Sequence, residues 1–407
     1  MKIPSLLVLL LFFNGGILTA KAASGTPDGS EQWGYARVRP KAHMFWWLYK
    51  SPYRVEDPNR PWPIVLWLQG GPGGSGVGIG NFQEVGPLDT DLKPRNSTWL
   101  RKADLLFVDN PVGTGFSFVE DTDALVTTDE EAATDLTTLL KEIFNKNLTL
   151  QKSPLYIVAE SYGGKYAVTL GLSVLRAIEA GDLKLKLGGI ALGDSWISPE
   201  DFVFSWGPLL KDVSRLDSNG LGLYEDATNS WSDLENVISM NSNSVRYSRY
   251  LDSMRATPGG DGDLDSLMNG PIRKKLNIIP PNVTWGGQSE DVFSALSGDF
   301  MKPRINEVDE LLRKGVNVTV YNGQLDLICA TKGTEAWIEK LKWEGLKEFQ
   351  AADRTALYCG DDLTRGFFKS YKNLHFYWIL EAGHFVPVDQ PCLALKMVGN
   401  ITQSPAP

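Results

Sequence analysis

A serine between small residues follows an apolar run and could act as a nucleophile. Residues 155–159, Leu-Tyr-Ile-Val-Ala, are typical of a buried strand, and residues 165–180 have helical spacing. Between them stands Glu-Ser-Tyr-Gly-Gly, with Ala159 and Gly163 two positions on either side of Ser161. A serine on a sharp strand-to-helix turn needs small neighbours there, because larger side chains would collide with the flanking elements. The pattern predicts a nucleophile elbow, and a helix-capping serine is the plainer alternative.

A serine nucleophile needs a base, and the sequence contains three histidines, of which two follow the serine. His375 opens the aromatic strand-like run 374–380, where a structural histidine is the natural interpretation. His384 lies just past that run. Catalytic side chains of open α/β sheets lie beyond the carboxyl ends of strands. We therefore predict that His384 is the base.

The base in turn needs an acid that orients it, and the expected chain order places that acid between the serine and the histidine. Asp326 follows the strand-like run 316–321 after a short loop. Asp194 also follows a strand-like run, 189–193. The spacing favours Asp326 and leaves Asp194 as a rival.

These residues require a sheet whose strand ends meet at one edge. Further strand-like runs lie at 46–49, 64–68 and 105–109, and helical spacing occurs at 130–144 and from about 390. Strands that alternate with helices predict an α/β protein with a mostly parallel sheet and helices on both faces. Between 199 and about 300 the alternation fails and helical fragments dominate. We interpret this stretch as a mainly helical cap insertion in a catalytic domain that spans 23–407.

Composition limits the class of protein. The 407 residues fit two or three domains or one large domain with an insertion, and 43% hydrophobic with 22% charged residues is ordinary globular usage. The net charge of −9, without a basic run, argues against a nucleic-acid partner. The three cysteines, Cys329, Cys359 and Cys392, permit one disulfide and leave one thiol, and the pairing stays open.

The N-terminus has the pattern of a secretory signal peptide, for which we expect the bounds 1–22. The apolar run Leu6–Phe13 precedes the small-x-small triplet Ala20-Lys21-Ala22 and is too short to span a membrane. We expect a secreted or endosomal–lysosomal protein with no membrane span. Asn-x-Ser/Thr sequons support glycosylation, at Asn96, Asn147, Asn282, Asn317 and Asn400. Asn317 begins a strand-like run and is the weakest acceptor among them.

Four segments in this order resemble the serine carboxypeptidase family of α/β-hydrolases. They are 67–76 (Trp-Leu-Gln-Gly-Gly-Pro-Gly-Gly-Ser-Gly), 109–117 (Asp-Asn-Pro-Val-Gly-Thr-Gly-Phe-Ser), 160–164 and 383–387 (Gly-His-Phe-Val-Pro). The similarity extends from about Trp33 to the C-terminus. It implies an α/β-hydrolase fold and a serine peptidase that acts on the C-termini of peptides or proteins.

Carried over position by position, the resemblance implies a triad of Ser161, Asp326 and His384, which decides between the two acids by analogy. The oxyanion would be bound by the backbone N–H groups of Gly71 and Tyr162. The carboxylate of the substrate would be held by Gln69, Gly70, Glu84 and Glu160, with Trp67 beside them. We expect neither a cofactor nor a metal. The oligomeric state is not implied.

The chain also departs from the family pattern. Gln69 replaces an asparagine, Gly74 a cysteine that normally forms a disulfide, and Phe385 a methionine. The segment after Pro208 is short, so the preference for the released residue is not inherited.

Two nearby glutamates would raise one another's pKa and could share a proton, so that one of them donates a hydrogen bond to the substrate carboxylate. This predicts an acidic optimum for carboxypeptidase activity, whereas a solvent-exposed Glu160 is the plainer interpretation. Two other functions remain as alternatives. One is an acyltransferase or esterase that uses the same triad, and the other is a secreted, non-catalytic binding protein.

Overall fold

A computed structural model describes residues 24–57, 59–238 and 261–406. The predicted signal peptide, 1–22, lies outside the described residues. The strands of the sheet are β1 (Ser24–Gly25), β2 (Glu31–Arg39), β3 (Ala42–Tyr49), β4 (Ile64–Leu68), β5 (Asp104–Val108), β6 (Phe118–Val119), β7 (Pro154–Glu160), β8 (Lys186–Gly193), β9 (Val318–Gly323), β10 (Thr355–Tyr358), β11 (Thr364–Tyr371) and β12 (Leu374–Ile379).

The strands form one mixed sheet in the order β1-β2-β3-β5-β4-β7-β8-β9-β12-β11-β10, with β6 beside β3. The six strands from β5 to β12 in this order pair in parallel. Both margins are antiparallel, β1-β2-β3 on one side and β11-β10 on the other. The α/β prediction is therefore confirmed, while the sequence interpretation missed β2, β10 and β11 at the margins.

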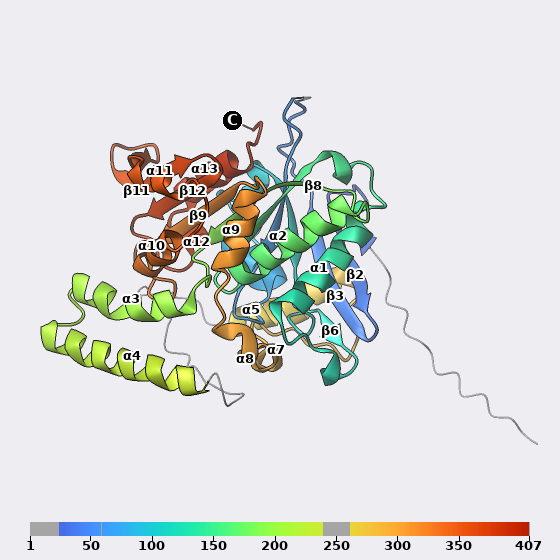
Figure 1. Cartoon of the computed structure of the whole chain (residues 1–407). Coiled ribbons are helices and arrows are strands. Elements are labelled where there is room, and N and C mark those ends of the chain that lie inside the picture. Colours follow the sequence, from blue (N-terminus) through green and yellow to red (C-terminus); the bar gives the residue numbers. More distant parts are fainter. Residues whose placement is uncertain (1–23, 58, 239–260, 407) are drawn as a thin grey trace, which may run out of the picture.

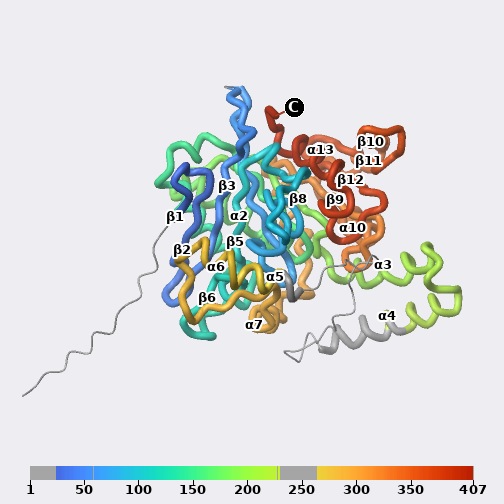
Figure 2. The backbone as a smooth tube through the Cα atoms, turned by 180° about the vertical axis from the view of Figure 1, so that it is seen from behind, coloured from blue at the N-terminus to red at the C-terminus, as the bar shows by residue number. Residues whose placement is uncertain are grey.

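Helices cover both faces of the sheet (Figures 1 and 2). One face packs against α1 (Asp129–Phe144), α2 (Gly163–Glu179), α9 (Ile305–Arg313) and α10 (Thr331–Glu339). The other face packs against α13 (Pro391–Ile401), the π-helical segment η1 (Gly76–Val85) and short helices nearby. Short elements complete the chain: η2 (Trp99–Arg101), η3 (Thr122–Ala124), η4 (Leu150–Lys152), α11 (Leu346–Ala351) and α12 (Val386–Asp389).

Strand β4 shows how the sequence builds two cores. Ile64, Leu66 and Leu68 belong to the core under α1 and α2, whereas Val65 and Trp67 belong to the core under η1 and α13. All five side chains are buried. Successive side chains of a strand point to opposite faces, so a continuous apolar run is what a strand covered on both sides requires.

The stretch from 199 to 300 contributes helices and, among its described residues, no strand of the sheet. These helices are α3 (Pro199–Asp212), α4 (Ser218–Ile238), α5 (Asp261–Leu267), η5 (Met268–Ile272), α6 (Arg273–Leu276), α7 (Glu290–Ala295) and α8 (Ser297–Phe300). The α3–α4 pair projects from the body of the molecule, while α5 to α8 lie against it (Figures 1 and 2).

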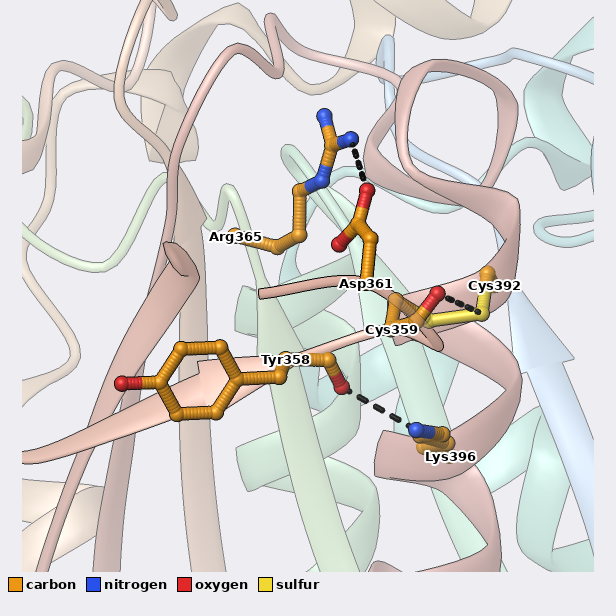
Figure 3. Close-up of a disulfide and its surroundings, with 6 residues drawn as sticks. All are labelled: Tyr358, Cys359, Asp361, Arg365, Cys392 and Lys396. Atoms are coloured by element: carbon orange, nitrogen blue, oxygen red, sulfur yellow. Dashed lines mark hydrogen bonds and ion pairs between the residues drawn. A yellow bond between two sulfur atoms is a disulfide. The ribbon is translucent and has the colours of Figure 1, made fainter. Parts of the chain in front are cut away.

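A disulfide joins Cys359 to Cys392 and so attaches the turn after β10 to the start of α13 (Figure 3). Close to it, Lys396 Nζ donates to the carbonyl of Tyr358 at 3.0 Å. The bond closes a loop across a sequence separation of 33, which by chain entropy stabilises the fold by about 4 kcal/mol. The third cysteine, Cys329, is a buried thiol.

Candidate active site

The predicted elbow lies between β7, which ends at Glu160, and α2, which begins at Gly163. Ser161 has a φ of +59°, a left-handed conformation that costs a residue with a side chain about 1–2 kcal/mol. Two hydrogen bonds hold it there. Its N–H donates to the carbonyl of Gly193 at the end of β8 (3.1 Å), and its carbonyl accepts from Trp196 (2.9 Å).

Glycines beside the elbow are required by close backbone contacts. A Cβ atom on Gly163 would lie 2.2 Å from the carbonyl oxygen of Leu68. A Cβ atom on Gly70 would lie 2.6 Å from the Cβ of Ser161 and 2.7 Å from the backbone nitrogen of Tyr162. The loop after β4 therefore lies directly against the predicted nucleophile and the first predicted oxyanion donor.

The second predicted oxyanion donor, Gly71, belongs to the same loop and has a φ of +112°, which favours glycine. A hydrogen bond from Gly74 N–H to the carbonyl of Gly70 (2.9 Å) closes the turn. Gly74 stands where the family usually has a cysteine, and a Cβ there would lie 2.9 Å from that same carbonyl oxygen. The turn therefore favours glycine both at Gly71 and at Gly74.

The predicted base and acid contact one another. His384 Nδ1 lies 2.8 Å from Asp326 Oδ2, and both residues are buried. The N–H of Cys329 donates to Asp326 Oδ1 at 3.2 Å. The histidine loop is held by Gly383, whose N–H donates to Asp389 Oδ2 at 2.7 Å. The rival acid, Asp194, instead accepts the N–H of Gly323 at 2.7 Å.

Asp326, Cys329 and His384 place potential ligand atoms within 4.8 Å of one another. The donor set suits a metal poorly. The Asp326 carboxylate and His384 Nδ1 already hydrogen-bond to each other. Burial raises the pKa of the Cys329 thiol well above its usual value, which keeps it in the protonated form that does not ligate metals.

The predicted carboxylate-binding residues form a buried chain of hydrogen bonds. Trp67 Nε1 donates to Gln69 Oε1 at 2.7 Å, and Gln69 Nε2 donates to Glu160 Oε1 at 2.8 Å. The longer amide that replaces the usual asparagine is thus engaged at both ends. Glu160 is completely buried, so the solvent-exposed interpretation of this residue was wrong.

Glu84 and Glu160 interact as two buried carboxyl groups. Burial, and then the charge of Glu84, raise the pKa of Glu160 well above its usual value. Burial also raises the pKa of Glu84, while the neighbouring Glu160 and Gln69 side chains lower it. Asp194 and the Asp326–His384 pair lie close by, since Asp194 contributes to the raised pKa of Glu160 and His384 acts on Glu84. We call Glu84, Glu160, Asp194 and Asp326 the acid cluster.

Asp109 is a supporting residue that the sequence interpretation did not single out. Its carboxylate accepts from Ser75 Oγ (2.5 Å) and from the N–H groups of Val77 (3.1 Å) and Phe116 (2.7 Å). Ser75 caps η1, the segment that carries Glu84. Burial raises the pKa of Asp109 to about 6. Its position at the start of the 109–117 segment was the available signal.

A second group of buried charges lies under Tyr162. The Tyr162 hydroxyl donates to Asp129 Oδ1 at 2.8 Å. Asp129 Oδ2 lies 3.4 Å from Lys165 Nζ and 2.8 Å from Arg304 Nη2, and Arg304 also pairs with Asp299 at 2.9 Å. We call Asp129, Lys165, Asp299 and Arg304 the ion-pair cluster. Sequence periodicity gives no signal for it, because its members come from α1, α2 and the region around α8.

The sequon asparagines lie at the surface. Asn96, Asn282, Asn317 and Asn400 are exposed, and Asn147 is half-buried. None of the described helices is long and apolar enough to cross a membrane.

Comparisons with known proteins agree with this fold and site. A family model described as serine carboxypeptidase matches residues 22–256 and 228–404. The chain is 63% identical to "Serine carboxypeptidase-like 51" of Arabidopsis thaliana, with 93% of each chain covered. It is 47% identical to human retinoid-inducible serine carboxypeptidase, over 98% of this chain and 96% of that one.

A crystal structure of Kex1(delta)p, a prohormone-processing carboxypeptidase from Saccharomyces cerevisiae, superposes with a TM-score of 0.75 at 22% identity. The alignment covers 92% of this chain and 91% of that chain, which shows a shared fold.

The fold and the family match define an α/β-hydrolase of the serine-peptidase class. The chain belongs to the serine carboxypeptidase family and is a serine-type carboxypeptidase. The family resemblance inferred from the four sequence segments is confirmed, and the 47% identity adds a likeness to the retinoid-inducible enzymes.

Proposed function

We propose that this protein releases C-terminal amino acids from peptides at acidic pH through a triad of Ser161, His384 and Asp326. The observation that carries the proposal is the buried chain Trp67–Gln69–Glu160, with Glu84 against it, beside a loop that contacts Ser161. Such a site matches a substrate whose carboxylate lies one residue beyond the scissile bond.

Chemistry would begin with attack of Ser161 Oγ on the last peptide carbonyl, while His384 Nε2 takes the hydroxyl proton. With Nδ1–H donated to Asp326, the ring is held in the tautomer that leaves Nε2 free to act as a base. The developing oxyanion would be stabilised by the N–H groups of Gly71 and Tyr162. His384 then protonates the leaving amine, and water hydrolyses the acyl-enzyme by the reverse proton transfers.

Recognition of the terminal carboxylate would need the protonated form of the glutamate pair. Since Glu160 has the more strongly raised pKa, it holds the shared proton and can donate it in a hydrogen bond to the substrate. Gln69 and the N–H of Gly70 would supply further donors. As pH rises, Glu160 ionises, this donor is lost, and a negative charge faces the carboxylate. Binding of free-acid peptides should therefore weaken toward neutral pH.

The stretch from 199 to 300 would act as a cap over this site. Phe300 stacks on the Tyr162 ring with centroids 5.7 Å apart, and Gln288 Nε2 donates to the carbonyl of Pro72 at 2.6 Å. These contacts support its placement next to both predicted oxyanion donors.

A secreted or endosomal–lysosomal location would fit an acidic optimum. The N-terminal pattern, the surface-exposed sequon asparagines and the Cys359–Cys392 disulfide support passage through the secretory pathway.

The test is a pair of pH–kcat/KM profiles, for a blocked dipeptide with a free C-terminus and for its amide or ester. The free acid should show a bell with an acidic maximum, because ionisation of the glutamates opposes deprotonation of His384. The amide or ester should keep its rate toward neutral pH. Glu84→Gln should flatten the alkaline limb for the free acid and leave ester hydrolysis nearly unchanged. Coincident profiles would instead indicate a general esterase or an endopeptidase.

A further inference from the structure

A buried aspartate lies behind the Asp326–His384 pair. Asp194 directly follows β8 and is completely buried. Its φ of +40° places it in the left-handed region, which Asp and Asn tolerate better than other residues with a side chain. Its Oδ1 accepts the N–H of Gly323, the last residue of β9 and the third before Asp326.

The second carboxyl oxygen of Asp194, Oδ2, is buried and accepts no hydrogen bond, so this carboxyl group favours its protonated form. In the described part of the chain, no N–H or O–H group donates to its Oδ2. Strands β8 and β9 are neighbours, so Asp194 at the end of β8 lies beside the loop that carries Asp326, and the Asp326 carboxyl group acts on it. Two neighbouring carboxyl groups can form a hydrogen bond only if one of them is protonated.

The proton belongs on Asp194. Asp326 lies 2.8 Å from a ring that becomes a cation during turnover, and the N–H of Cys329 donates to its other oxygen, so its anion is stabilised on two sides. Asp194 accepts the N–H of Gly323 on one oxygen but, among the described residues, has no cation beside it and no donor to the other oxygen. Burial, and then the charge of Asp326, raise its pKa well above the usual range.

We propose that Asp194, as a neutral carboxylic acid, is a positioning residue that donates a hydrogen bond to the Asp326 carboxylate and holds it toward His384. The inference rests on the triad of the proposed function. A donated hydrogen bond binds part of the negative charge of the Asp326 carboxylate, which limits how strongly this carboxylate stabilises the protonated imidazole. His384 can therefore act as a base at lower pH. The bond from Gly323 N–H to Asp194 also links the end of β8 to the end of β9.

Other titratable groups around Asp194 do not change this assignment. Glu84 on η1 raises the pKa of Asp194. Asp194 in turn raises the pKa of three neighbours, which are Glu160 on β7, Tyr321 on β9 and Cys329 in the following loop. Burial is the largest cause of the raised pKa at all four of these groups. None of these four groups can carry a positive charge. They therefore cannot stabilise a negative charge on Asp194, and the neutral form remains favoured.

The experiment compares Asp194→Asn, Asp194→Ala and Asp194→Leu with the unmodified enzyme, by pH–kcat/KM profiles on an ester or amide substrate without a terminal carboxylate. Asparagine keeps a neutral donor and an acceptor for Gly323 and suits the backbone, so its kcat/KM should stay within about threefold. Alanine and leucine lack the donor and should lose about 10- to 100-fold, the usual worth of a hydrogen bond to a charged group.

The pH profile separates positioning from mere structural support. Without the donor, the Asp326 carboxylate directs its full charge to the imidazolium and stabilises it more, so the acid limb of the alanine and leucine variants should move up by about one pH unit. Structural damage would lower the rate without moving that limb. The unmodified enzyme should lose rate at alkaline pH as Asp194 ionises, while Asp194→Asn stays flat.

Controls make each outcome decisive. Asp309→Asn removes a buried carboxyl that accepts from the N–H of Lys342, away from the triad, and should change neither limb. An unmoved acid limb in Asp194→Ala, or equal losses in the asparagine and alanine variants, would overturn the proposal. If the apolar variants fail to fold, coincident alkaline limbs of Asp194→Asn and the unmodified enzyme would overturn it. Failure of the triad itself would show separately, as turnover by Ser161→Ala.

Discussion

Two groups of buried carboxyl residues flank the Ser161–Tyr162 elbow and differ in how their charge is balanced. In the ion-pair cluster, Asp129 and Asp299 face two cations, and Arg304 reaches both. In the acid cluster, Glu160 and Asp194 face mainly other carboxyl groups, and burial raises the pKa of each. Carboxyl groups at similar depth are thus paired with cations on one side of the elbow and face other carboxyl groups on the other.

The comparison indicates that the protonation of a buried carboxyl group depends on the charges of its neighbours as well as on burial. Burial lowers the pKa of Lys165 to about 8, so its ammonium still balances Asp129 throughout the acidic range. The ion-pair cluster should therefore behave as fixed structure below pH 7. Because burial raises the pKa of Glu160 and of Asp194 well above the usual range, we expect the acid cluster to respond to pH.

The largest expected effect lies at the proposed nucleophile and its proposed base. Ser161→Ala and His384→Ala should each reduce kcat by several orders of magnitude, while the protein folds and is secreted. Single-turnover assays and labelling by a fluorophosphonate probe measure this, and the serine variant should not be labelled. Hydrolysis by purified Ser161→Ala at the unmodified rate would falsify the assignment.

Within the acid cluster, Asp326→Asn should cost three to four orders of magnitude in kcat, roughly the loss known when a triad acid is replaced by its amide. Asp194→Asn should stay within about threefold, because asparagine keeps a neutral hydrogen-bond donor at this position. Both variants remove one buried carboxyl, so each is the control for the other. A greater loss in Asp194→Asn, with the fold intact, would mean that the acid is misassigned.

The ion-pair cluster can be broken through Arg304, which is 7% exposed in its side chain. Arg304→Met leaves Asp129 and Asp299 buried with less compensation and should reduce the free energy of unfolding by about 3–5 kcal/mol. Denaturant unfolding at pH 5 measures it. Lys372→Met, which removes a solvent-exposed pair with Glu344, should leave stability unchanged. Equal behaviour of the two variants would show that the buried cluster contributes nothing special.

The smallest effect is a slope of stability with pH. Because burial raises the pKa of Glu160, the folded protein keeps a proton that the unfolded chain loses near pH 4.5. The stabilisation is complete below that pH and declines as pH rises, by up to about 1.4 kcal/mol per unit for one group. Glu160→Gln cannot ionise and should flatten the slope of unfolding free energy between pH 5 and 7, whereas the exposed Glu179→Gln should not. Parallel slopes would contradict a protonated Glu160.

Much of the fold and site followed from local patterns. The buried strands β4, β7 and β9 were recognised from apolar runs, because strands covered on both faces carry apolar residues on both. The missed strands β2, β10 and β11 lie at the sheet margins, where polar and half-buried residues blur the pattern. The pairing of Cys359 with Cys392 was equally open, since it depends on where α13 lies against the β10 turn.

Sequence by itself determined the elbow, the histidine past the last strand and the family, since each rests on residues adjacent in the chain. Spacing and the family resemblance favoured Asp326, but tertiary structure established that this aspartate meets His384, because β8 and β9 are neighbours and an aspartate follows the end of each. It also decided that Glu160 is buried against Glu84. Protonation depends on distances between side chains from different elements, and linear order does not contain those distances.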